Sequence, residues 1–192
     1  LKNKYLEHPL LSHWYTWNKP MNHPKLTCIP EGLNYDRQQV VLSRYLNKYP
    51  LKATNDRKLL CINCSLHTNN NRGVLMNKVQ KEWIGFCDIV ENIPFIKEYY
   101  QGSYIEGKIK ISVTHPKCYE VLSNYKFILS PPGTGLDCHR TWEALYLNII
   151  PIMISSSIDE LFDDLPVIIV KNWNEITEEF LIKKYEEINE NR

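Results

Sequence analysis

The chain has 192 residues and a mass of 22.7 kDa, with 43% hydrophobic residues and a formal net charge of +1. An aromatic content of 11% and nearly cancelling charges exclude an intrinsically disordered chain, and the length suits one domain or slightly more. With 23 Lys and Arg against 22 Asp and Glu, broad nucleic-acid binding is excluded. No apolar stretch approaches the roughly 18–20 residues of a membrane span.

The first fifty residues differ in character from the rest. They contain His8, His13 and His23 and the aromatic run Ser12-His-Trp-Tyr-Thr-Trp17, with a helical pattern only over residues 37–49. We expect four parts: an N-terminal remnant (1–50), a linker (51–56), an α/β domain (57–175) and a C-terminal helix (176–192). Because the sequence starts at Leu1 without the pattern of a signal peptide, we expect a fragment of a longer chain, and a targeting segment could lie outside it.

Strands and helices alternate from residue 57 onward. Strands are predicted at residues 58–66, 108–113, 126–129, 149–154 and 166–170, and helices at 73–83, 94–101, 116–124, 138–147 and 174–190. The strands are almost continuously apolar, which is typical of parallel strands that are covered on both faces. The sequence therefore predicts an α/β fold with a Rossmann-like parallel sheet flanked by helices.

The six cysteines do not predict a metal site. Cys61 and Cys64 have the spacing of half a zinc site, but they fall in a predicted strand, where residues three apart point to opposite faces. No second Cys-x-x-Cys pair exists to complete four ligands. We interpret these cysteines as small buried hydrophobic residues.

The loop after the strand at 126–129 has the features of an anion site. Gly133 and Gly135 allow a ligand to approach the backbone, and the helix that follows offers free N–H groups. Arg140 lies in the first turn of that helix, where the helix dipole disfavours a cation by about 0.3–1 kcal/mol. Charge-assisted hydrogen bonds of about 1.5–3 kcal/mol each to a bound phosphate would outweigh that cost.

Two alternatives stay open at this helix. Arg140 and Glu143 can form an ordinary intrahelical ion pair, or Arg140 can bind a diphosphate while Glu143 accepts hydrogen bonds from ribose hydroxyls. Asp137, next to His139, can be a ligand contact or simply the N-cap of the helix, and we favour the N-cap.

Common nucleotide motifs are missing. The sequence has no Gly-x-x-x-x-Gly-Lys-Ser/Thr, which excludes a P-loop, and Gly133-x-Gly135 is only part of a dinucleotide fingerprint. It also has no Asp-x-Asp pair that could hold a metal on a diphosphate. An NAD-dependent enzyme is therefore a remote alternative.

Residues 127–152, which include Ser130-Pro-Pro-Gly-Thr-Gly-Leu-Asp-Cys-His-Arg-Thr-Trp-Glu143, resemble the donor-binding signature of exostosin-like glycosyltransferases, most closely the branch of viral and ribitol-type xylosyltransferases. The similarity continues through Leu165-Pro-Val-Ile-Ile-Val-Lys-Asn-Trp173. It implies a GT-B fold in which the C-terminal Rossmann-like domain holds a UDP-sugar and the N-terminal remnant belongs to the acceptor side. It further implies inverting transfer to a glycan hydroxyl, without a metal or other cofactor.

The resemblance also assigns the donor-binding residues. On this reading Arg140 neutralises the diphosphate, Glu143 holds the ribose, and the other donor-binding positions lie in two loops: Ser65, Thr68, Arg72, Ser130, Pro132, Gly133, Gly135, Asp137 and His139. His13 is a weak candidate for the base, since histidine titrates near neutral pH, although a structural histidine is the more common case. A cellular family member would act in the Golgi lumen and a viral one in the host cytoplasm. The alternative function is a non-catalytic module that binds a nucleotide or a glycan.

Overall fold

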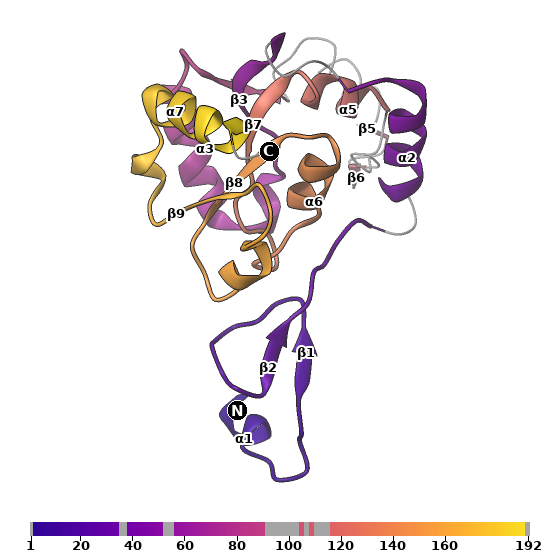
Figure 1. Cartoon of the computed structure of the whole chain (residues 1–192), viewed down its shortest axis with the longest axis vertical. Coiled ribbons are helices and arrows are strands. Elements are labelled where there is room, and N and C mark those ends of the chain that lie inside the picture. Colours follow the sequence, from indigo (N-terminus) through magenta and orange to yellow (C-terminus); the bar gives the residue numbers. More distant parts are fainter. Residues whose placement is uncertain are drawn as a thin grey trace.

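The computed structural model describes residues 2–34, 38–51, 56–90, 104–105, 108–109 and 116–190. Its centre is a five-stranded parallel sheet in the order β4-β3-β7-β8-β9, with helices on both sides (Figure 1). The strands are β3 (Lys58–Ile62), β4 (Cys87–Ile89), β7 (Tyr125–Leu129), β8 (Ile150–Ile154) and β9 (Ile168–Val170). This confirms the predicted α/β fold with a parallel sheet.

The remaining elements lie around this sheet and before it in the chain. The helices are α1 (Lys2–Leu6), α2 (Gln38–Lys48), α3 (Asn70–Glu82), α5 (Pro116–Leu122), α6 (His139–Tyr146) and α7 (Glu178–Glu190). Short 3₁₀ turns cover Leu66–Thr68, Asp159–Phe162 and Trp173–Glu175. Two small sheets pair β1 (Trp14–Thr16) with β2 (Leu26–Cys28) in parallel, and β5 (Tyr104–Ile105) with β6 (Lys108–Ile109) in antiparallel.

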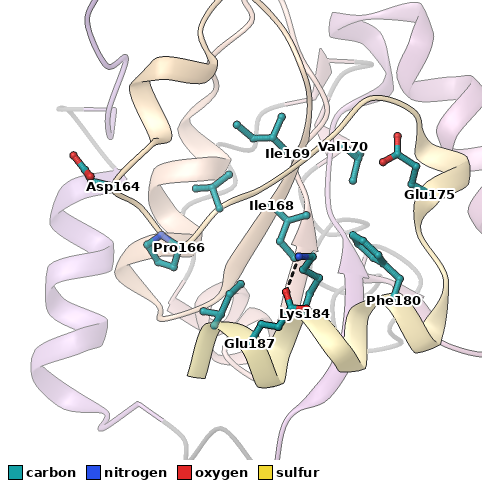
Figure 2. Close-up of a pocket in the computed structure, with 11 residues that line it drawn as sticks. Asp164, Pro166, Ile168, Ile169, Val170, Glu175, Phe180, Lys184 and Glu187 are labelled. Atoms are coloured by element: carbon teal, nitrogen blue, oxygen red, sulfur yellow. Dashed lines mark hydrogen bonds and ion pairs between the residues drawn. The ribbon is translucent and has the colours of Figure 1, made fainter. Parts of the chain in front are cut away.

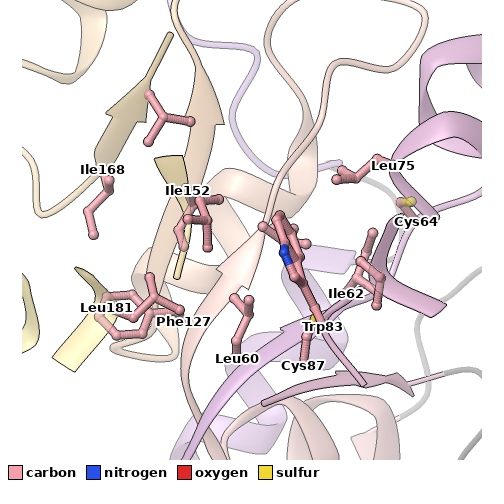
Figure 3. Packing of buried hydrophobic residues seen from close by; sticks show 14 of the residues in the cluster. Leu60, Ile62, Cys64, Leu75, Trp83, Cys87, Phe127, Ile152, Ile168 and Leu181 are labelled. Atoms are coloured by element: carbon pink, nitrogen blue, oxygen red, sulfur yellow. The ribbon is translucent and has the colours of Figure 1, made fainter. Parts of the chain in front are cut away.

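Both faces of the sheet are buried, as the apolar strands predict. On one face α3 and α7 cover a core that includes Leu60, Phe127 and Ile152 (Figure 3). On the other face α2, α5 and α6 cover a second core built on the alternate strand residues, such as Cys61 and Ile128. Cys61 lies in the second core and Cys64 in the first, but β3 ends at Ile62, so Cys64 lies in the following loop and not in the strand predicted over residues 58–66.

The chain before residue 50 contributes to this domain. Leu42 and Tyr45 of α2 are buried in the second core, although the sequence groups this helix with the N-terminal remnant. Residues 2–34, with α1, β1 and β2, form a unit that extends from the sheet domain (Figure 1) and packs on it through Cys28, which is buried with Met153, Ile158 and Phe162. Helix α7 packs on the sheet through Leu181, and Tyr185 makes an edge contact with Phe127.

Some boundaries differ from those the sequence predicts. The predicted helix at 94–101 lies outside the described residues, and of the predicted strand at 108–113 only the first two residues are described; they pair with β5 and not with the parallel sheet. Strand β4 escapes the sequence pattern because it has only three residues and Asp88 interrupts its apolar character. The turn before β8 is closed by Asn148 at φ 55°, a left-handed conformation that asparagine tolerates, and Arg57 donates to its carbonyl at 2.8 Å.

Candidate functional site

The strand order places a topological switch point between β3 and β7. Counted along the chain, the strands lie in the order 2-1-3-4-5, so the connections from β3 and β7 leave toward opposite faces of the sheet. The loop after β3 (63–69) leads to α3, and the loop after β7 (130–138) leads to α6. In open parallel sheets, ligands bind in the crevice that forms at the carboxyl ends of such strands.

Arg72 joins the two loops. From the first turns of α3, its buried guanidinium donates to the carbonyls of Pro131 at 2.9 Å and Pro132 at 3.0 Å, and to the carbonyl of Ser65 and hydroxyl of Thr68 at 3.0 and 2.8 Å. The family resemblance places Arg72 among the donor-binding residues. In the structure its hydrogen bonds hold the shape of both loops, and its charge remains at this edge of the sheet.

Gly133 is required by its contact with Arg72. A Cβ added at this glycine would lie 3.0 Å from Arg72 Nη2, and Asn69 Nδ2 donates to the Gly133 carbonyl at 3.0 Å. Gly135 has more room, because its Cβ would meet the Asp137 carbonyl at an ordinary 3.5 Å. The packing therefore explains why position 133 is a glycine, and it gives no such reason for position 135.

Hydrogen bonds with helix α6 and strand β8 hold the first residue of the β7 loop, Ser130, in place. The buried Ser130 hydroxyl lies 2.8 Å from Thr141 Oγ1 in α6, and its backbone N–H donates to the Ile152 carbonyl. Burial raises the pKa of the Cys138 thiol, which lies 3.6 Å from Ser130 Oγ and so stays protonated near neutral pH. In the facing loop, Ser65 and Thr68 are exposed at the surface.

Arg140 and Glu143 form the intrahelical ion pair that the spacing allows. Arg140 Nη1 lies 2.6 Å from Glu143 Oε2, and the Tyr119 hydroxyl of α5 donates to Glu143 Oε1 at 2.8 Å. The Glu143 side chain is 1% exposed and the Arg140 side chain 13%. Burial, followed by the charge of Glu143, raises the pKa of Tyr119, so its hydroxyl keeps its proton. Arg140 is therefore the member of the pair that reaches the surface.

Asp137 is not the N-cap of α6, contrary to our interpretation of the sequence. Cys138 occupies the N-cap position, and the buried Asp137 carboxylate accepts hydrogen bonds from the backbone N–H groups of Cys138 and Glu31 and from the Trp142 indole. Burial raises the pKa of Asp137, and these hydrogen bonds counteract part of that effect. This carboxylate joins the β7 loop to the N-terminal unit.

The contacts between the N-terminal unit and the β7 loop were not visible in the sequence. His139 Nδ1 lies 2.7 Å from the Gly32 carbonyl, and its Nε2 lies 3.6 Å from the Glu31 carboxylate. Asn18 Oδ1 accepts from the Leu136 N–H at 3.1 Å. The two residues of each pair are more than a hundred positions apart in the chain, so no local sequence pattern predicts these contacts. His13 lies within the N-terminal unit itself, where Nε2 is 2.7 Å from Thr27 Oγ1.

A cavity of about 420 Å³ opens at the carboxyl edge of the sheet. It lies between the first turns of α3, the loop residues Pro131 and Pro132, and the segment that follows β9, including Lys171 and Trp173. A wider groove of about 710 Å³ runs between β9 and α7 (Figure 2). Apolar residues of β9 form one wall of that groove, and Lys184 and Glu187 pair with each other at 2.6 Å on the other, which leaves no excess charge from this pair for a ligand.

No protein-family model matches this chain, and the search of curated proteins gave no significant match. Within the described residues, no helix combines the length and the apolar character needed to cross a lipid bilayer. The same part of the chain holds no group of three or more His, Cys, Asp and Glu side chains arranged to hold a metal ion.

Proposed function

We propose that this chain is the nucleotide-sugar-binding portion of a glycosyltransferase, which uses a UDP-sugar as donor and a glycan hydroxyl as acceptor. The observation that carries the proposal is the position of the β7 loop. The segment that resembles the exostosin-like donor signature folds as strand β7, loop, helix α6 and strand β8, and its loop meets the β3 loop at the switch point of the sheet. Donor binding in the cleft of a GT-B enzyme would use this edge.

In this proposal Arg140 faces the diphosphate. It follows the loop at the start of α6 and is partly exposed, and the buried Glu143 fixes its guanidinium. A cation and the N-terminal N–H groups of a helix both stabilise the negative charge that develops on a departing diphosphate. Glu143 would act mainly by positioning Arg140, since a contact with ribose requires the Arg140 side chain to move aside first.

The proposed reaction is a metal-independent transfer with inversion. The acceptor oxygen forms a bond to the anomeric carbon as the bond from that carbon to the diphosphate breaks, and a base takes the proton of the acceptor hydroxyl. The sequence assigns no base to this step beyond the weak candidate His13, whose Nε2 lies 2.7 Å from Thr27 Oγ1. The UDP-xylose donor, like the GT-B architecture, comes from the family resemblance alone.

Calorimetry with UDP, GDP and NAD tests the donor site. We expect UDP to bind, and Arg140→Ala to weaken it about 10- to 100-fold, which corresponds to one charge-assisted hydrogen bond. Arg140→Lys retains the charge and should lose less, so it separates loss of contact from loss of fold. Arg44→Ala is the matched control, because Arg44 is exposed on α2. Absence of UDP binding, or binding unchanged by Arg140→Ala, would reject the proposal, and UDP binding without sugar transfer by the full-length protein would favour a non-catalytic module.

A further inference from the structure

The groove between β9 and α7 follows the outer edge of the central sheet (Figure 2). Strand β9 is last in the strand order, and residues 166–170 form one wall of the groove. Ile168 and Val170 are buried in the first core, whereas Val167 and Ile169 pack on the opposite face of the sheet. Because neighbouring residues of a strand point to opposite faces, a groove that touches all of them runs along the edge of the strand, where the backbone is accessible.

The backbone of Ile169 faces this groove. The N–H of Ser155, directly after β8, donates to the Val170 carbonyl at 2.8 Å, so Val170 bonds toward β8. In a parallel ladder, alternate residues bond to the same neighbour, and the N–H and carbonyl of the residue before Val170 therefore point to the other side. In the part of the chain that the structure describes, no strand pairs with that side of β9. Ile169 can thus accept and donate hydrogen bonds to an added strand.

The groove carries an excess of negative charge. Asp164 lies before β9 and Glu175 after it, and both are exposed (Figure 2). Glu175 Oε1 accepts the Asn172 N–H at 2.7 Å, which leaves the charge of the carboxylate in place. The other charged residues among the described lining are Lys184 and Glu187, which pair with each other. Two carboxylates therefore remain, one toward each end of the strand, and they favour a cationic ligand over an anionic one.

The wall that faces β9 is apolar between these charges. Phe180 and Ile188 of α7 line it, and both side chains are partly buried. The opposite wall, residues 166–170, spans about 16 Å at about 3.3 Å per residue. A strand edge beside apolar side chains suits an extended peptide, since the edge supplies main-chain hydrogen bonds and the apolar residues select side chains. Pro166 has no N–H and β9 is short, so any added strand pairs over only a few residues.

We propose that this groove binds an extended, basic peptide segment of a partner protein, which adds to β9 as a further strand. Apolar side chains of the segment face Phe180 and Ile188, and a Lys or Arg at each end faces Asp164 or Glu175. A second copy of this chain is a poorer occupant. A symmetric antiparallel contact between two β9 edges would bring the Asp164 end of one copy beside the Glu175 end of the other, and like charges oppose such a contact.

Fluorescence anisotropy with the labelled peptide Lys-Thr-Val-Thr-Val-Thr-Lys tests this inference. We expect the peptide to bind, and the same peptide with Glu at both ends to bind at least about 10-fold more weakly. A third peptide, N-methylated at its three central residues, keeps the charges and lacks the N–H groups that β9 requires, so it should also lose about 10-fold. Asp164→Asn and Glu175→Gln should each weaken the basic peptide by up to about 5-fold. Glu186→Gln, an exposed position on α7 outside the groove, is the matched control and should change nothing.

Hydrogen exchange followed by NMR locates the bound peptide. Saturating basic peptide should slow exchange of the Ile169 amide about 10-fold or more and leave the amides of β4, at the other end of the strand order, unchanged. The inference is overturned if the basic peptide does not bind, if the methylated or Glu-ended peptide binds equally well, or if neither Asp164→Asn nor Glu175→Gln weakens binding. Dimerisation of the chain that protects the Ile169 amide without peptide would assign this edge to a second copy and would also overturn it.

Discussion

The Tyr119 hydroxyl donates a 2.8 Å hydrogen bond to Glu143 Oε1, and so links α5 to the carboxylate that pairs with Arg140. Glu143 is nearly inaccessible to solvent, with its other oxygen on the Arg140 guanidinium. A buried carboxylate is costly unless hydrogen bonds and a cation replace its hydration. Tyr119 and Arg140 together replace the water that the Glu143 side chain loses on burial beneath the start of α6.

Tyr119→Phe should lower the free energy of unfolding by about 1.5–3 kcal/mol, the usual value for a hydrogen bond to a charged group. A urea titration followed by circular dichroism measures this change. Tyr15→Phe is the control, because Tyr15 is exposed on β1, and it should stay within about 0.5 kcal/mol of wild type. Equal stabilities for the two variants would show that the Tyr119–Glu143 bond contributes nothing.

Neutralising Arg140 and neutralising Glu143 should lower the free energy of unfolding by different amounts. Arg140→Gln leaves a buried carboxylate without its cation, which costs about 3–5 kcal/mol when a buried pair is broken. Glu143→Gln should cost less, because the Arg140 side chain is 13% exposed and the Glu143 side chain only 1%. Urea titrations of both single variants and of the double variant measure the coupling. Additive losses would contradict a direct pair.

Gly133→Ala should destabilise the chain through Arg72. The new Cβ would lie 3.0 Å from Arg72 Nη2, and four hydrogen bonds to the two loops prevent the guanidinium from moving freely. We expect a loss of about 1–3 kcal/mol in thermal or urea unfolding. Gly73→Ala, within α3 and with open space around its Cβ, should instead gain up to about 1 kcal/mol. In an Arg72→Ala background, the loss caused by Gly133→Ala should disappear; its persistence would rule out this contact as the cause.

The sequence predicts the strands, the helix and the loop of this site well, and the hydrogen bonds between residues far apart in the chain poorly. Strand β7, helix α6 and strand β8 follow from local apolar periodicity, and the loop between them is marked by Gly133 and Gly135. The spacing of Arg140 and Glu143 gives their pair directly, since residues three apart share a helix face. These features depend on neighbours in the chain, which is why a single sequence reveals them.

The features that escaped depend on partners far away in the sequence. No sequence rule predicts that Arg72 donates hydrogen bonds to carbonyls about sixty residues later in the chain. Asp137 has the position of a helix cap, but the N–H of Glu31 and the Trp142 indole offer it a buried alternative. Lys171 and Trp173 line the same cavity as Pro131 and Pro132 because β9 runs parallel to β7 in one sheet. The order of strands in a sheet does not follow from a local sequence pattern.

Asp137 gives the chain a specific dependence on pH. Burial raises its pKa above the ordinary value, while hydrogen bonds from Glu31, Trp142 and Cys138 and the nearby His139 lower it. A group whose pKa is higher in the folded state binds its proton more tightly there. Its stabilising contribution is therefore complete below the unfolded pKa, near about 4, and is lost as the pH rises through the folded pKa.

Asp137→Asn removes that titration. The difference in the free energy of unfolding, wild type minus variant, should decrease as the pH rises from about 4 toward 7. Urea titrations at several pH values measure it. Glu31→Gln serves as a comparison, because burial also raises the pKa of Glu31 and its pH dependence has the same sign. A difference that is constant or grows with pH would contradict the assignment to Asp137.

Lys19 makes one of the contacts that hold the N-terminal unit to the sheet domain. Its side chain is 5% exposed, Nζ lies 2.6 Å from Glu160 Oε1, and the Lys19 carbonyl accepts a hydrogen bond from the Ser157 hydroxyl. Glu160→Gln should weaken this attachment by about 1–3 kcal/mol, because it leaves a buried ammonium beside a neutral amide. Lys19→Met should cost less, since it removes the buried charge and retains the apolar stem.

Hydrogen exchange of the β1 and β2 amides measures this attachment directly. In Glu160→Gln we expect faster exchange at Trp14–Thr16 and Leu26–Cys28, with the strands of the central sheet unchanged, because the ion pair joins two units and supports neither core. Glu186→Gln, an exposed glutamate on α7, is the matched control. If Lys19→Met accelerated exchange more than Glu160→Gln, the packing of the Lys19 stem would hold the unit in place, and the ion pair would be secondary.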